Sequence, residues 1–115
     1  MARVTLTPIA VPAAYATAAV AIVWTAADVA LKNQFVGTGR EIVLVQNADA
    51  GATHTVIITS VADPYNRTGD ITQIVAISTF MTFFIVPITG FLQTDGFVYL
   101  EGDNANLKFA ILRLP

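Results

Sequence analysis

The sequence predicts an all-β protein, and three observations favour that class. β-Branched and aromatic residues occur in short runs separated by turn-forming residues, a pattern typical of many short strands. The 115 residues suit one domain. The chain is 55% hydrophobic but only 12% charged, whereas a typical soluble domain is roughly 25% charged. We therefore expect a single-domain β-sandwich, jelly-roll-like, of about seven or eight strands, with apolar surface left over for contact with other proteins.

The first segment, residues 1–16, is predicted to form an extended N-terminal arm, followed by the β-sandwich domain at residues 17–115. Pro8 and Pro12 remove backbone donors and push the residues before them to extended angles. Because such an arm has no sheet of its own to join, we expect it to lie on a neighbouring molecule. The apolar side chains expected to make this contact are Val4, Leu6, Ile9 and Val11.

The alanine-rich stretch at residues 13–30 gives mixed signals. Alanine favours helix, but residues 20–25 are β-branched or aromatic at most positions and favour strand. We expect a strand at residues 19–24, after which residues 25–30 have room for one short helical turn.

Six further strands are predicted along the rest of the chain. Stretches that contain Gly, Pro, Asn or Asp, the residues that form turns, separate most of them. The expected strands are residues 41–46, 53–60, 71–77, 80–86, 97–101 and 107–112.

The strand at residues 80–86 is apolar on both faces. In a two-layer sandwich one face of each sheet is usually exposed to water, so this strand carries more apolar surface than the fold requires. We predict a subunit interface here; the alternative is that loops or the arm of the same chain cover this face. The residues predicted to form the interface are Phe80, Met81, Phe83, Phe84 and Ile85.

Groups that could carry chemistry are sparse. The chain has no cysteine, its one histidine is His54, and its serines are Ser60 and Ser78. A hydrolytic triad needs a histidine held between a nucleophile and an acid, and most acids here fall in predicted turns, where Asp usually bonds its own backbone. The loop at residues 63–70 offers oxygen ligands but lacks the spacing of an EF-hand. We therefore expect no enzyme activity, cofactor, metal or small-molecule substrate, while ion binding by this loop stays open.

Nucleic-acid and membrane partners are also not expected. The six basic residues are scattered, whereas phosphate binding needs a clustered patch. Two uncharged stretches, residues 4–27 and 71–94, each have 24 residues and are long enough to span a membrane. Proline, glycine and threonine interrupt them, and no basic cluster flanks them. A small two-pass membrane protein remains the alternative. A second alternative is a carbohydrate-binding jelly roll with aromatic platforms at Trp24, Tyr15, Tyr65 and Tyr99.

Six segments within residues 25–115 carry a resemblance to a known family. They are TAAD (25–28), NQF (33–35), TGREIVLVQN (38–47), RTGDI (67–71), DGFVYL (95–100) and FAILRLP (109–115). The chain resembles small virion proteins of tailed bacteriophages, of the head decoration or cement type. The resemblance implies a jelly-roll-like sandwich that binds the major capsid protein on the outside of the phage head, often as a trimer. It also implies assembly in the host cytoplasm. The interface predicted above for the 80–86 strand would then face a sister subunit or the capsid.

Overall fold

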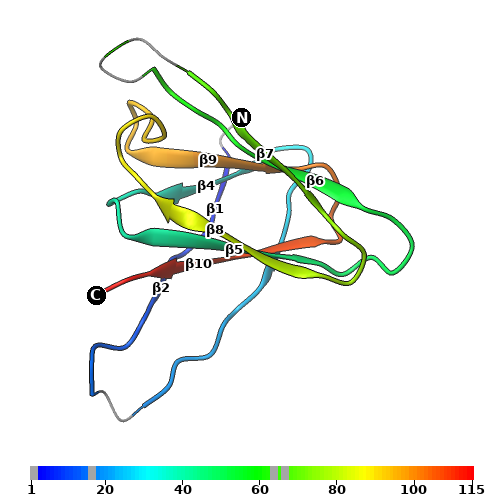
Figure 1. Cartoon of the computed structure of the whole chain (residues 1–115), viewed down its shortest axis with the longest axis horizontal. Coiled ribbons are helices and arrows are strands. Elements are labelled where there is room, and N and C mark those ends of the chain that lie inside the picture. The colour runs from blue at the N-terminus through cyan, green and yellow to red at the C-terminus, as the bar shows by residue number, and fades with distance from the viewer. Residues whose placement is uncertain (1–2, 16–17, 63–64, 66–67) are drawn as a thin grey trace.

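The structure, a computed structural model, describes residues 3–15, 18–62, 65 and 68–115. Ten strands form two sheets that pack face to face, and no helix occurs in the described part of the chain (Figure 1). The molecule measures 41 × 39 × 25 Å along its principal axes. The prediction of an all-β sandwich is confirmed.

Each sheet has five strands. Sheet A has the order β1-β4-β9-β6-β7. Its strands are β1 (Val4–Thr5), β4 (Asn33–Val36), β9 (Phe97–Gly102), β6 (His54–Ile58) and β7 (Ile71–Val75). Sheet B has the order β2-β10-β5-β8, with β3 also paired to β10. Its strands are β2 (Ile9–Ala10), β10 (Leu107–Arg113), β5 (Glu41–Asn47), β8 (Phe80–Val86) and β3 (Thr25–Ala26).

Strands β3 to β10 have the connectivity of an eight-stranded jelly roll. Without β1 and β2 the two sheets are β3-β10-β5-β8 and β4-β9-β6-β7, and every pairing in them is antiparallel. The chain changes sheet at every connection except that between β6 and β7. Two interleaved Greek keys of this kind define the jelly roll. Strands β1 and β2 add to it in parallel orientation, which accounts for ten strands where seven or eight were expected.

The N-terminal segment is part of this sandwich. β1 pairs with β4 and β2 pairs with β10, and the side chain of Leu6 between them is buried in the core. Residues 3–11 therefore cover one edge of each sheet, whereas the sequence predicted an arm that lies on a neighbour through Val4, Leu6, Ile9 and Val11. The difference arises because β4 and β10 offer unpaired backbone groups within reach. Residues 1, 2 and 16 of the predicted arm lie outside the described residues.

The later strands lie close to their predicted positions, and β8 has the predicted bounds. The early part of the chain differs from its predicted structure. No strand forms at residues 19–24, and the short strands β1 to β4 were not predicted. Residues 25–30 do not form a helix; instead a single turn follows β3, in which the amide of Lys32 donates to the carbonyl of Asp28 over 2.9 Å.

The core lies between the sheets and follows strand alternation. In β5 every second residue is buried, from Glu41 through Val43 and Val45 to Asn47, while the residues between them face outward. The largest apolar side chains that are fully buried are Phe35, Phe109, Ile58, Leu100, Leu107 and Ile111.

Candidate interaction surface

Strand β8 ends sheet B on one side and contains the predicted interface. Its pairing with β5 shifts between Ile42 and Leu44, so that two residues of β8, Phe83 and Phe84, lie opposite a single residue of β5. Such a β-bulge breaks the regular alternation of side chains. As a result Phe83 points into the core, while Phe84 and Ile85, which follow it, are both about half exposed.

The structure divides the five predicted interface residues into two groups. Phe80, Phe84 and Ile85 are 63%, 47% and 48% exposed. Phe83 is 8% exposed and belongs to the core, and Met81 is partly buried against it. Phe83 therefore contributes mainly to the core, because the bulge directs its ring between the two sheets, and it reaches the surface only in the wall of a groove.

A groove runs between β8 and β7. It has a volume of about 410 Å³ and is lined by Ile71 and Gln73 of β7 and by the β8 residues from Met81 to Phe84. β7 and β8 are the last strands of sheets A and B in the described part of the chain. The groove thus lies between two open sheet edges, whereas β1, β2 and β3 cover the opposite edges.

A second apolar hollow lies on the outer face of sheet B. It has a volume of about 340 Å³, and Ile22, Trp24, Leu44 and Phe80 contribute to its walls. The rings of Trp24 and Phe80 pack at a tilt with their centroids 5.7 Å apart. The chain that leads into β3 therefore extends the apolar surface of β8.

Most of the segment that leads from β2 to β3 belongs to residues 12–24, which we call the finger; the structure describes residues 12–15 and 18–24 of it. Both of its ends are held by β10: the amide of Val11 donates to the carbonyl of Arg113 over 2.9 Å, and Thr25 pairs with Phe109. Figure 1 shows residues 12–15 and 18–21 extending past β2, whereas the end of the finger at Ile22 and Trp24 packs beside Phe80 of β8. The finger is therefore anchored at the β10 edge of sheet B and reaches β8 across the outer face of that sheet.

Apolar side chains of the finger face solvent. Tyr15 is fully exposed, and Val20, Ile22 and Val23 are 51%, 46% and 65% exposed. The finger carries no charged residue. Together with Phe80, Phe84 and Ile85 of β8, these side chains are exposed apolar groups outside the core, and Ile22 and Phe80 line the same hollow.

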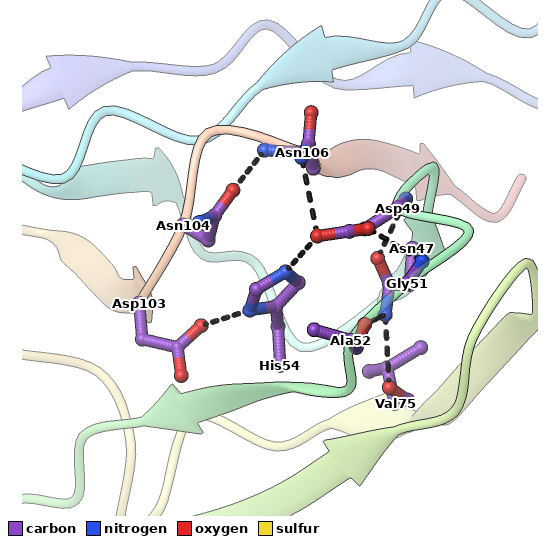
Figure 2. Close-up of polar contacts among 9 residues, drawn as sticks. All are labelled: Asn47, Asp49, Gly51, Ala52, His54, Val75, Asp103, Asn104 and Asn106. Atoms are coloured by element: carbon purple, nitrogen blue, oxygen red, sulfur yellow. Dashed lines mark hydrogen bonds and ion pairs between the residues drawn. The ribbon is translucent and has the colours of Figure 1, made fainter.

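His54 lies at one end of the sandwich between two carboxylates (Figure 2). Its Nε2 atom is 2.9 Å from Asp49 Oδ2, and its Nδ1 atom is 3.3 Å from Asp103 Oδ1. The pKa of Asp49 is lowered, first by the backbone N–H of Gly51 and then by the hydrogen bond with His54. Because a carboxylate faces each ring nitrogen, neither nitrogen is placed to take a proton from a nucleophile. The cluster joins the β5–β6 loop to the β9–β10 loop.

Asn47 supports the same loop from inside. Its amide nitrogen donates to the carbonyl of Ala52 over 3.0 Å and to that of Val75 over 3.1 Å, and its amide oxygen accepts from the backbone N–H of Asp49 over 2.9 Å (Figure 2). Asn47 is fully buried. Its three contacts therefore connect β5 to the following loop and to β7.

Glu41 closes the other end of β5. Its side chain is fully buried, yet it accepts hydrogen bonds from the amide and hydroxyl of Thr38 and, over 2.6 Å, from Nε of Arg113. Burial alone raises the pKa of Glu41, but the contacts with Thr38 and Arg113 outweigh it and hold the pKa below its usual value of 4.5. Sequence reasoning missed this pair, because the two residues lie 72 positions apart.

The predicted alternative sites are only partly within the described residues. In the 63–70 loop, Asp70 accepts from the backbone N–H and hydroxyl of Ser60, but Asp63 is outside the described residues. Of the aromatic platforms, Trp24 packs on Phe80, and Arg3 lies 4.1 Å from the centre of the Tyr99 ring. The other two, Tyr15 and Tyr65, are exposed.

These features define a jelly-roll protein with many exposed apolar side chains on the finger and β8. We found no family model, curated protein or solved structure that matches the chain. No helix in the described part is long and apolar enough to cross a membrane.

Proposed function

We propose that the chain is a structural virion protein that binds the outer surface of a bacteriophage head and decorates or stabilises it. The observation that carries the proposal is the apolar surface outside the core, formed by the finger and by Phe80, Phe84 and Ile85 of β8. Monomeric soluble proteins rarely leave contiguous apolar patches of more than a few hundred Å² in water. A subunit that remains bound in an assembly buries such a surface against its neighbours.

The fold is compatible with this role. Jelly rolls occur in viral capsid proteins and in lectins, although a fold by itself does not fix a function. The resemblance of six segments in residues 25–115 to head decoration proteins favours the virion. The proposed partners are the major capsid protein and further copies of this chain, with a trimer as the preferred state.

The test is the protein content of virions. Virions of the phage that encodes the chain are purified and their proteins quantified by mass spectrometry against the major capsid protein. We expect the chain in a fixed, near-stoichiometric ratio and on the outside of the head, where added protease or antibody reaches it. Its absence from virions, or a copy number far below that of the capsid protein, would overturn the proposal.

A carbohydrate-binding module is the second candidate, because lectins share the jelly roll and Tyr15 presents a fully exposed ring. A glycan array separates the two functions. Under the virion proposal we expect no saturable binding. Binding that Tyr15→Ala abolishes would instead favour the carbohydrate function.

A further inference from the structure

The finger contains a strand-forming segment that has no sheet. Residues 18–23 read Ala-Ala-Val-Ala-Ile-Val, and the β-branched residues among them favour extended structure. In the structure these residues belong to no strand, and no backbone hydrogen bond joins them to another described residue. Their backbone N–H and C=O groups therefore remain available for pairing.

Strand β8 provides a sheet edge that has no strand. One side of β8 pairs with β5, and on the other side the groove beside β7 opens. An uncovered edge presents a row of free backbone donors and acceptors, and natural proteins usually protect such edges with charge, proline or a covering segment. β8 contains no charged residue and no proline, and Phe84 and Ile85 beside its edge are exposed.

We propose that residues 18–23 of the finger pair with the free edge of β8 in a second copy of this chain, adding a strand to its sheet B. Main-chain hydrogen bonds would supply affinity, and the groove would receive alternate apolar side chains of the added strand. This inference rests on the proposed role as an assembly subunit and names the contact between copies.

Charge and length favour a second copy as the occupant. The finger lies in an uncharged stretch of 24 residues and β8 in another, so their contact buries no unpaired charge. Residues 18–23 span roughly 20 Å when extended, close to the length of the seven-residue strand β8. The segment is therefore long enough to lie along β8 of a neighbouring copy.

The position of the two partners determines the kind of assembly. The finger leaves sheet B at the β10 side and β8 forms the other side (Figure 1). The two contact segments are thus different parts of the molecule, so the contact is either exchanged reciprocally between two copies or repeated head-to-tail. A head-to-tail contact closes into a ring when the rotation between copies allows it, and otherwise extends as an open chain.

Cross-linking between two variants tests the contact between the finger and β8 directly. The chain has no cysteine, so an introduced thiol is the only one present. Val20→Cys and Phe84→Cys chains are prepared separately, mixed and treated with a short bismaleimide. We expect the mixture to give several-fold more cross-linked dimer than either variant alone. Equal yields in all three samples would overturn the proposal.

Sedimentation of charged variants provides the second test. We expect the full-length chain to self-associate, and Val20→Asp in the finger and Ile85→Asp on β8 each to shift it to monomer. The matched control is Val29→Asp, which alters a similarly exposed residue in the turn after β3 and should leave association unchanged. Thermal unfolding of each variant confirms that it is folded.

The outcomes separate this contact from the proposed function. A wild-type chain that stays monomeric at the highest soluble concentration, yet is present in virions, overturns the contact and leaves the virion role in place. A chain that forms the contact but is absent from virions overturns the virion role and leaves the contact in place.

Discussion

β5 and β8 are neighbours of equal length, seven residues each, but they differ in how their residues are used. Along β5, buried and half-buried positions alternate without interruption, and polar residues with complete hydrogen bonding occupy both buried ends. β8 has a bulge, two buried residues and a free edge with exposed phenylalanines.

The difference separates residues that specify the fold from residues that the fold does not require. β5 has strands on both sides, so each of its side chains has a determined environment. β8 has a strand on one side only, and Phe80, Phe84 and Ile85 contribute little to the core. Within the molecule Phe80 packs on Trp24 and Phe84 on Phe91, and the proposed contact with a second copy would bury the rest of their surface. The predictions below test this contrast.

The largest difference is expected from the same charge placed on each strand. Val45→Asp in β5 buries an unpaired carboxylate and should cost more than about 4 kcal/mol, enough to prevent folding. Ile85→Asp in β8 should change the free energy of unfolding by about 1 kcal/mol or less. Urea denaturation followed by circular dichroism measures both. Similar losses of unfolding free energy at Val45 and Ile85 would contradict the difference proposed between β5 and β8.

A smaller effect is expected at the buried end of β5. Asn47→Ala removes the donor to the carbonyls of Ala52 and Val75 and the acceptor for the amide of Asp49. Buried groups left without partners should lower the free energy of unfolding by about 2–3 kcal/mol. Asn106→Ala, at an exposed position near the same loop, serves as the control in the same urea titration. A loss below that of the control would contradict the assigned role of Asn47.

The carboxylate of Glu41 should make stability depend on pH. Its folded pKa lies below the usual 4.5, so its contribution is complete above that value and is lost as the pH falls through the folded pKa. Glu41→Gln should cost about 1–2 kcal/mol at neutral pH and should flatten the acid limb of the stability profile. Asp49 and Asp95 also have lowered pKa values, Asp95 mainly through its hydrogen bond from Tyr99, so part of the limb should remain. An unchanged acid limb in the variant would contradict this role of Glu41.

The smallest change in stability is expected at the exposed end of β8. Phe80→Ala removes the ring that packs on Trp24 and should cost about 1 kcal/mol or less. Because Trp24 is the only tryptophan, its fluorescence reports on the surroundings of this one ring, and we expect a red shift of its emission when Phe80 is removed. Phe84→Ala leaves the Trp24 contact intact and should not shift the emission.

Sequence reasoning was most successful where periodicity is long. β5 and β8 each carry a seven-residue run, and both were located closely. β1 and β2 have two residues each, too few for any period, and their strand character comes from the edges of β4 and β10. The strand predicted at residues 19–24 has the right propensity but pairs with no strand among the described residues. Local preference cannot supply that partner.

The surface was predicted only in part for a related reason. The run from Phe80 to Val86 indicates excess apolar character, but the bulge that buries Phe83 and exposes Phe84 depends on pairing with β5. The contact between Glu41 and Arg113 likewise depends on the register of β5 against β10. Such features arise from distant segments and leave no local signal.

The central position of β10 also bears on synthesis. β10 pairs with β2, β3 and β5, so most of sheet B depends on the last of its strands to leave the ribosome. Ile9 can pair only after Leu112, about a hundred residues later in the chain, has been synthesised. Folding of sheet B therefore follows translation of residues 107–113, and the many distant pairings favour slow folding, on the order of milliseconds to seconds. During that interval the uncharged segments are exposed together, and chaperones or a slow supply of chains would protect the newly made protein from aggregation.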